Sequence, residues 1–598
     1  MMKIGCYILA SITLLVALLY GLARMAMPQA PSTPSVLTIE ELPPAPYPEN
    51  FEHELNQIHA TRVILHEEAE LPQHLKWTRG ETFPEIGSPD AVKGGTLKLC
   101  NVGPFPSNFL AFGSTVEQFF HYNLFNCIDV PLVRQHPQTG QIIPGLAESW
   151  TQQGNTLYFK LNTKARYTNG RPVRAGDFAL GILLRLRSGD AKTADYARAV
   201  HIYGDSIVAV EPRKARVLGH LQAAAILKPT EPGFYADFGP DYSTRYAQRI
   251  PPSTGAYTIS HVQRGRKIIL SRHPNWWAKD LPGFRYSCNV DHIEHHFLTD
   301  EAQAWELFLD KRLDMMQTRN VVAWQQYMES ERADGIYQFK AEANTPLPPY
   351  GIAFNASTLP NLQLRRGLMQ AMDMKHAIQV IFRGEAERLS HFSSGYNLLQ
   401  HKTEQYNYNP LEARKCFMAA GYTEQGADGI LRKKDGTRLS VRLMYTPSEK
   451  IDTLVTLLAQ SAAKCGAEIV PEPLSWQNSA KKIEEKGHQL LFWSTVPGRP
   501  LPDYSRFFHS TARGHDAPFC LNDREIDAGI EAAEQALTVE AAQHACAKMD
   551  EMVYKRAIWL PGWKENIINV AAWPHVHIPN AAFSTFDVAD SHLLWLEP

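Results

Sequence analysis

The chain has 598 residues, of which 44% are hydrophobic, and this is enough apolar material for two sizeable cores. The formal net charge of -2 gives no reason to expect a polyanionic partner, and no basic stripe with interleaved aromatic residues appears, which argues against nucleic-acid binding. We expect most of the 12 Trp, 23 Tyr and 26 Phe residues to be core, while Trp residues in loops can line a ligand cavity.

The N-terminus carries an uncharged apolar run of 20 residues, Ile4 to Ala23. Such a run is long for the core of a signal peptide and close to the length of one membrane span. We interpret residues 1–27 as an export signal that is either cleaved or retained as a membrane anchor. Seven prolines between Pro28 and Pro48 then predict that 28–92 is a stiff tether and N-terminal extension. This order places the body in the periplasm, tethered to the cytoplasmic membrane if the anchor stays.

The first part of the body is predicted to be rich in strands. The segment "KGGTLKLCNVG" (93–103) has an apolar run between glycines and predicts an opening strand. The segment "TLYFKLNTKARYTNGRPV" (156–173) alternates in polarity and carries an Asn-Gly pair, a strong signal for a tight turn. The segment "GAYTISHVQRGRKIILSR" (255–272) predicts two further strands around an Arg-Gly-Arg turn.

One short stretch, "IYGDSIV" (202–208), resembles the nucleophile block of a hydrolase. The residues on either side of it alternate as in a β-hairpin, and this places Asp205 and Ser206 at the turn. The Gly-x-Ser-x-Gly nucleophile elbow is absent from the chain. We therefore interpret Ser206 as a turn residue and not as a nucleophile.

The middle of the chain mixes helices and strands. The segment 360–382 predicts one helical stretch in which Leu364, Leu368 and Met372 form an apolar face. "REIDAGIEAAEQAL" and "VEAAQHACAKMDEMVYK" predict two more helices. The strands expected in "AEIVPEPLSW" and "HQLLFWSTV" alternate with helices, a pattern typical of an α/β lobe.

The sequence gives little support for a metal or cofactor. His292, His295 and His296 cluster in "DHIEHHF", but no second cluster completes a zinc set. No Cys-x-x-Cys occurs, so neither a zinc knuckle nor a thioredoxin-like site is indicated. No Walker A sequence occurs either, so no nucleotide-binding P-loop is indicated. We expect no metal and no cofactor.

Several segments, taken in order, resemble the family 5 extracellular solute-binding proteins of ABC importers, of the oligopeptide and microcin type. These segments are "DAVKGGTLKL", "PGLAESWTQQGNTLYFKLNTKARYTNGRPVRAGDF", "PSTGAYTISHVQRGRKIILSRHPNWWAKD" and "GIAFNASTLPNLQLRRGLMQAMD". The resemblance runs from about Lys93 to about Pro579.

The resemblance implies a large two-lobed α/β fold of the periplasmic binding-protein type (type II), with an extra strand-rich subdomain in lobe I. Lobe I is then expected at 93–345 and again at 550–598, with lobe II at 346–549. Crossovers near Tyr350-Gly351 and near "VYKRAIWLPGW" (553–563) are expected to act as the hinge.

The resemblance also implies a binding protein and not an enzyme. Such a protein captures a peptide or peptide-like ligand between its lobes and presents it, as a monomer, to the permease subunits of an ABC transporter. The alternatives are a ligand-binding sensor or scaffold without a transporter, and a secreted hydrolase. The expected ligand-binding residues, with no catalytic residue among them, are Phe105, Asn108, Asn355, Trp493, Arg499 and Asp503.

One position departs from the family pattern. Many peptide-binding members keep an acidic residue shortly after the tryptophan that matches Trp493, and it pairs with the free amine of the peptide. Val496 stands at that position here. A buried ammonium without a counter-charge is costly, so either Asp503 supplies the charge or the ligand has no free N-terminal amine. In the second case Arg499 can receive a carboxylate or a phosphate through a bidentate fork.

Overall fold

The computed structural model describes residues 36–38, 62–80, 82–113, 128–188, 196–213, 219–342, 349–396, 404–494, 502–512, 514, 517–536, 538–565, 567–583 and 590–597. The apolar run at 4–23 lies outside these ranges, so its role as a signal or an anchor stays a prediction. Within the ranges, none of the helices has both the length and the apolar character needed to cross a bilayer.

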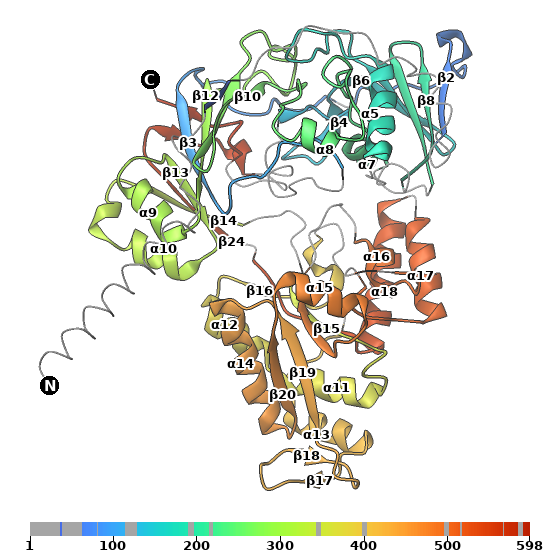
Figure 1. Cartoon of the computed structure of the whole chain (residues 1–598), viewed down its shortest axis with the longest axis vertical. Helices are drawn as coiled ribbons and strands as arrows, with labels where there is room; N and C mark the ends of the chain where they lie inside the picture. Colours follow the sequence, from blue (N-terminus) through green and yellow to red (C-terminus); the bar gives the residue numbers. More distant parts are fainter. Residues whose placement is uncertain are drawn as a thin grey trace, which may run out of the picture.

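Two lobes make up the described part of the chain (Figure 1). The chain passes from the first lobe to the second between β14 (Tyr337–Glu342) and β15 (Gly351–Phe354). It returns between β23 (Trp563–Lys564) and β24 (Ile567–Ala572). The two-lobed α/β fold that the sequence predicts is therefore present. The return lies after β23, so the boundary expected at 549/550 falls inside helix α18 (Val539–Lys555).

The first lobe contains two five-stranded sheets. One has the order β1-β10-β11-β12-β3, built from Val36–Thr38, Tyr257–Gln263, Lys267–Arg272, His292–Leu298 and Thr96–Val102. The other has the order β2-β8-β9-β7-β6, built from Arg62–His66, Ala197–Tyr203, Ile207–Pro212, Thr156–Leu161 and Ala147–Gln153, and packs with α5 (Ala175–Arg187) and α7 (Gly219–Ile226). The strands predicted at 93–103 and 255–272 belong to the first sheet, and the strand predicted at 156–173 belongs to the second.

The hairpin between β8 and β9 shows whether Ser206 lies in a turn. Tyr203 pairs with Ile207 across the hairpin, and Gly204 between them has a φ of 54°. Glycine adopts this left-handed conformation without the steric penalty that a Cβ brings. Asp205 and Ser206 therefore lie in the turn, as predicted.

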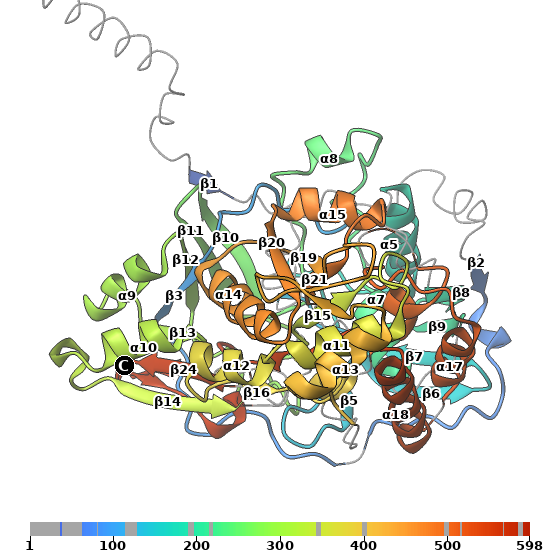
Figure 2. The same ribbon diagram turned by 90° about the horizontal axis from the view of Figure 1, so that it is seen from below.

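A smaller sheet carries both crossovers on the side of the first lobe. Its order is β13-β24-β14, with β13 at Met315–Thr318, and both outer strands run antiparallel to β24. Helices α9 (Glu301–Leu309) and α10 (Val321–Met328) pack on it through a core that includes Trp305 and Phe308. Seen from below, this unit and the sheet with β7 and β8 lie on opposite sides of the second lobe (Figure 2).

The second lobe has one five-stranded sheet with a separate core on each face. Its order is β20-β19-β21-β15-β22, built from Glu468–Pro473, Ser440–Tyr445, Leu490–Trp493, Gly351–Phe354 and Trp559–Pro561. One core includes residues of α11 (Leu362–Ala371), α12 (Met374–Phe382), α13 (Pro410–Ala419) and α14 (Glu449–Lys464). The other includes residues of α15 (Trp476–Glu484), α16 (Tyr504–Phe508), α17 (Arg524–Glu534) and α18. Side chains of β21 alternate between the two cores because successive residues of a strand point to opposite faces.

The helical segment predicted at 360–382 is divided into α11 and α12. Its apolar face is correct, since Leu368 and Met372 are buried. The break occurs at Asp373, whose carboxylate accepts a hydrogen bond from the backbone N–H of His376 at 3.0 Å and so starts a new helix. An aspartate in this role competes with continuation of the preceding helix.

Candidate functional site

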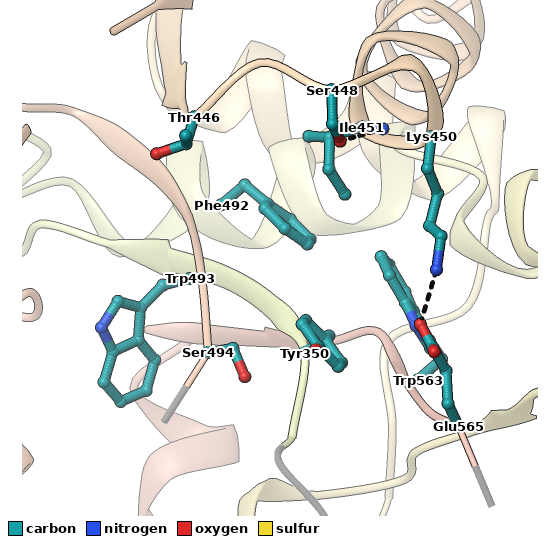
Figure 3. A pocket seen from close by; sticks show the side chains of 10 residues that line it. All are labelled: Tyr350, Thr446, Ser448, Lys450, Ile451, Phe492, Trp493, Ser494, Trp563 and Glu565. Carbon is teal, nitrogen blue, oxygen red and sulfur yellow. Dashed lines mark hydrogen bonds and ion pairs between the residues drawn. The ribbon is translucent and has the colours of Figure 1, made fainter. Parts of the chain in front are cut away.

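A cavity of about 340 Å³ opens in the second lobe where the two crossovers leave it. Its lining residues come from the carboxyl ends of the parallel strands β19 and β21, from the start of α14 and from the crossovers (Figure 3): Tyr350, Thr446, Ser448, Lys450, Ile451, Phe492, Trp493, Ser494, Trp563 and Glu565. The carboxyl ends of strands are where open α/β sheets bind ligands. The volume is within the range of small-ligand sites.

Three aromatic rings form the apolar wall of the cavity. Tyr350 and Trp563 flank the crossovers, and Phe492 lies on β21. The ring centroids of Tyr350 and Trp563 are 5.1 Å apart, and those of Phe492 and Trp563 are 5.5 Å apart. The three ring planes lie within 21° of parallel. Offset stacking of this kind is favourable beyond the area it buries, so the wall is a rigid feature.

Two glycines allow the crossovers to run side by side at this wall. Tyr350 N–H donates to the Trp563 carbonyl at 3.1 Å, and Gly562 N–H donates to the Tyr350 carbonyl at 2.8 Å. A Cβ at Gly351 would lie 2.5 Å from the Trp559 ring, and a Cβ at Gly562 would lie 2.6 Å from the Tyr350 carbonyl oxygen. Both distances are too short for a real contact, so the close approach requires glycine.

An ion pair closes one side of the cavity. Lys450 Nζ lies 2.8 Å from Glu565 Oε1, and Trp563 Nε1 donates to the same carboxylate oxygen at 3.3 Å (Figure 3). The Glu565 side chain is 14% exposed and that of Lys450 is 40% exposed. Burial, and then the negative charge of Glu565, raise the pKa of Tyr350, so its phenol stays protonated at neutral pH. The cavity thus combines an apolar wall, one paired charge of each sign and neutral hydroxyls.

Of the six residues predicted to bind ligand, Trp493 lines this cavity. Its ring lies on the other face of the sheet from Phe492, in contact with Phe507, Phe519 and Trp559 at centroid distances of 4.9, 5.9 and 5.9 Å. Figure 3 shows the Trp493 ring turned away from Phe492 and Tyr350. Trp493 therefore borders the cavity from behind its aromatic wall.

Asn355 is fully buried at the far end of β15 from Tyr350. Its Nδ2 donates to the carbonyls of Lys486 and His488, at 3.1 and 2.9 Å. Its Oδ1 accepts from the backbone N–H of Ser357 at 2.9 Å and from that of Thr358 at 3.3 Å. The carboxamide thus organises the end of the strand.

Phe105, Asn108 and Asp503 are not among the residues that line the cavity. Phe105 and Asn108 lie in the first lobe, where the ring of Phe105 packs edge-on against Phe297 at 4.9 Å and Asn108 Oδ1 accepts from Leu110 N–H at 3.2 Å. Asp503 is the N-cap of α16. Arg499 lies outside the described residues, so its role stays a prediction.

Five residues that form the aromatic wall and the ion pair of the cavity were not predicted from the sequence: Tyr350, Phe492, Trp563, Lys450 and Glu565. The sequence did contain some indication of three of them, Phe492, Tyr350 and Trp563. Phe492 precedes Trp493 in a strand, so one of the pair had to face each side of the sheet. Tyr350 and Trp563 lie in the two segments that the sequence identified as crossovers. Lys450 and Glu565 had no local signal, because 115 positions of sequence separate them.

The structure gives hydrolase chemistry no support near Ser206. A Gly-Asp-Ser hydrolase would need a downstream Asp-x-x-His, and the chain has this pattern at Asp373–His376. That pattern lies in the second lobe and serves as the cap of α12. Within the described ranges, no group of three or more His, Cys, Asp or Glu side chains is arranged to hold a metal ion.

A Ser–His–Asp arrangement occurs elsewhere in the second lobe, with His391 and Asp550 buried and Ser390 half-buried. Ser390 Oγ lies 2.7 Å from His391 Nδ1, and His391 Nε2 lies 3.7 Å from Asp550 Oδ2. The Asp550 carboxylate also accepts from the Tyr504 hydroxyl at 3.1 Å and from the Ser393 hydroxyl. These bonds join α16 and α18 to the segment at 390–394. The set does not line the cavity, and it acts as a structural network.

Comparison with known proteins places this geometry in a family context. The profile of the bacterial extracellular solute-binding proteins, family 5 Middle, matches residues 141–515. A Brucella suis protein named as a binding protein is 24% identical over 330 residues, which cover 52% of this chain and 53% of that protein. The chain spans about half the length of the curated relatives that it matches first.

Two solved structures share the fold. The oligopeptide-binding protein AppA of Bacillus subtilis, in complex with a nonapeptide, has a TM-score of 0.66 at 15% identity, covering 85% of this chain and 100% of that one. NikA of Brucella suis, in complex with Fe(III)-EDTA, has a TM-score of 0.69 at 18% identity, covering 84% and 100%.

Proposed function

The chain belongs to the bacterial extracellular solute-binding proteins of family 5, and from this we propose that it captures a peptide or peptide-like solute between its lobes and presents it to the permease of an ABC importer. Proteins of this family bind substrates and work outside the cytoplasm. The observation that carries the proposal is the position of the cavity. It opens at the carboxyl ends of strands, beside both crossovers, so a bound solute contacts the segments about which the lobes move.

The mechanism is capture by closure. A solute that contacts both lobes stabilises the closed arrangement only by the difference between its affinities for the closed and the open form. The aromatic wall receives the apolar part of the solute, and the Lys450–Glu565 pair receives its polar part. Phe105 and Asn108 are proposed to approach the solute from the first lobe, and Arg499 from the loop after β21.

The mixed lining supports a peptide-like solute better than a purely apolar or a highly charged one. Three rings offer a surface for side chains, while one lysine and one glutamate match the balanced charge of a peptide. The fold alone does not choose the solute, since the two neighbours were solved with a nonapeptide and with Fe(III)-EDTA. We propose that the protein is a periplasmic monomer whose N-terminal run either directs export or holds it at the membrane.

The test uses the full chain, purified, unfolded to remove any solute and refolded. A mixture of free peptides of roughly two to ten residues is added, and native mass spectrometry and small-angle scattering follow the result. We expect discrete protein–peptide masses and a smaller radius of gyration in the saturated sample. No bound mass at any peptide concentration, or tight binding without any change in radius, would contradict capture by closure.

A further inference from the structure

The Lys450–Glu565 pair indicates which charge the solute carries at this end of the cavity. We propose that Glu565 binds an ammonium group of the solute, beside the aromatic wall, and that Lys450 is the cation that the solute displaces. This inference rests on the proposed function, because it concerns the solute of the same cavity.

Glu565 is the fixed member of the pair. Its side chain is 14% exposed, and the indole N–H of Trp563 donates to its Oε1. Its backbone carbonyl accepts from Arg319 Nε of the first lobe at 3.3 Å, which anchors the residue from the other side. The carboxylate therefore keeps its place whichever cation it pairs with.

Lys450 is the member that can leave. Its side chain is 40% exposed, and its stem is flexible. Its Nζ already lies 4.9 Å from the centroid of the Phe382 ring, which offers the ammonium a second, favourable position. A lysine that moves toward this ring and the solvent loses little, since partly exposed ion pairs contribute weakly to stability.

The alternative, in which a solute carboxylate binds Lys450 in place of Glu565, is unfavourable. A solute carboxylate bound to Lys450 would draw that lysine away from Glu565, the more buried of the two, and leave only the Arg319 guanidinium near it. It would also bring a second negative charge to an aromatic wall whose ring faces favour cations. Glu565 is the only carboxylate among the described residues that line the cavity, and the Asp503 carboxylate caps α16 instead. A solute ammonium that displaces Lys450 therefore replaces one cation with another, and Glu565 keeps a counter-charge.

The experiment compares three probes that share one ring and differ in charge: 2-phenylethylammonium, 3-phenylpropionate and 2-phenylethanol. Each is titrated calorimetrically into the refolded full chain, with Trp fluorescence as a second readout. We expect the ammonium probe to bind at least about tenfold more tightly than the other two, since a carboxylate and three rings both favour it. Tighter binding of the carboxylate probe would overturn the assignment.

Three variants test the roles of Glu565 and Lys450 in binding the probes. Glu565→Gln keeps the shape but removes the charge, so the preference for the ammonium probe is expected to disappear. Lys450→Met removes the resident cation, so the ammonium probe is expected to bind several-fold more tightly than to the wild type. Glu387→Gln is the control, because Glu387 pairs with Lys564 at 2.9 Å, one strand position from the wall but outside the lining. It is expected to bind all three probes as the wild type does.

The outcome separates this inference from the proposed function. If free peptides bind but the ammonium preference is absent, or survives in Glu565→Gln, the charge assignment fails and the capture of peptides stands. If neither the peptides nor the probes bind, the proposed function itself fails. Circular dichroism of each variant establishes that it is folded before its titration is interpreted.

Discussion

Gly351 shows how one residue controls the geometry of the cavity. It follows Tyr350 at the first crossover and pairs with Trp493 and Pro561 on its two sides. An added Cβ would meet the Trp559 ring at 2.5 Å and the Leu560 carbonyl oxygen at 2.6 Å. Both neighbours are buried, so neither can move aside without disturbing the sheet.

We therefore expect Gly351→Ala to lower the free energy of unfolding by about 1–3 kcal/mol, the usual effect of forcing an extra carbon into a packed core. Urea denaturation of the ligand-free protein measures the change. Gly487→Ala is the matched control, because the nearest atom to a Cβ there is 3.6 Å away, an ordinary contact. An equal loss in both variants would show that crowding at the crossover is not the cause.

At the residue scale, the sequence indicates which side chains are suited to bind a ligand better than it indicates which way those side chains point. Trp493 does end a buried strand and borders the cavity, while its role in binding a ligand stays a prediction. Which of Phe492 and Trp493 faces the aromatic wall depends on the pleat of β21, and that is set by its pairing with β15. Asp503 was a candidate counter-charge, but a helix that starts directly after it uses the carboxylate as a cap.

At the scale of elements, the β12–β3 pair contains a half-buried histidine. His295 lies opposite Leu99 in this parallel pair, and Asn101 Nδ2 donates to its Nδ1 at 3.1 Å. An acceptor nitrogen carries no proton, so the bond requires the neutral ring. Burial, followed by the positive charges of His592 and His296, lowers the pKa of His295 to about 4.

This shift predicts acid sensitivity of the first lobe. In the unfolded chain the pKa is about 6.5, so the contribution is complete above that pH and is lost as the pH falls toward 4. His295→Gln cannot titrate. We expect the stability advantage of the wild type over this variant to shrink by roughly 1–3 kcal/mol between about pH 7 and about pH 4.5. Urea denaturation at both values measures it.

A neighbouring substitution without a titrating group is the control. Ile293→Val on the same strand removes one buried methylene and is expected to cost about 1 kcal/mol at either pH. A pH-dependent difference for Ile293→Val as large as that for His295→Gln would show that the strand pair as a whole, and not the histidine, responds to acid.

Elements with local signals were predictable from the sequence. The hairpins β8–β9 and β10–β11 have turns fixed by glycine at 204 and 265, with φ of 54° and 69°. The division of α11 from α12 was not predicted, because the apolar periodicity continues across Asp373. The helix ends there because the Asp373 N–H donates to Ser461 Oγ of α14 at 2.9 Å, in place of the helical hydrogen bond that would continue α11. That tertiary contact lies far away in the sequence.

At the scale of the whole molecule, the lobes and both crossovers could be expected from the family resemblance, but the cavity could not. Its lining joins residues between 350 and 565, which meet only once the sheet of the second lobe has formed. The return of the chain was expected at 549/550, with a crossover near "VYKRAIWLPGW" (553–563), but it occurs after β23. Pairing of β22 with β15 keeps that strand in the second lobe.

One side chain of the second lobe binds both crossover strands. Glu385 lies in the turn after α12 and is 13% exposed. Its Oε1 lies 2.7 Å from Lys340 Nζ on β14, and its Oε2 accepts from Asn569 Nδ2 on β24 at 3.0 Å. Any rotation of the lobes that changes the path of β14 or β24 must stretch or rebuild these bonds. Glu385 therefore stabilises the arrangement of lobes seen here.

We expect Glu385→Ala to loosen the two crossover strands while leaving the chemistry of the cavity intact. Asn569 is fully buried, and losing its acceptor there costs on the order of 1–3 kcal/mol, so local opening of β24 becomes roughly 5- to 100-fold more frequent. Hydrogen exchange followed by mass spectrometry over 337–342 and 567–572 measures this directly. In Glu387→Ala the lost partner, Lys564, belongs to the second lobe, so exchange in β14 and β24 is expected to match the wild type. Equal exchange in all three proteins would mean that Glu385 does not restrain the crossovers. Faster exchange in Glu385→Ala alone, together with an altered affinity for peptides but the same order of preference among them, would link the solute's affinity to the motion of the lobes.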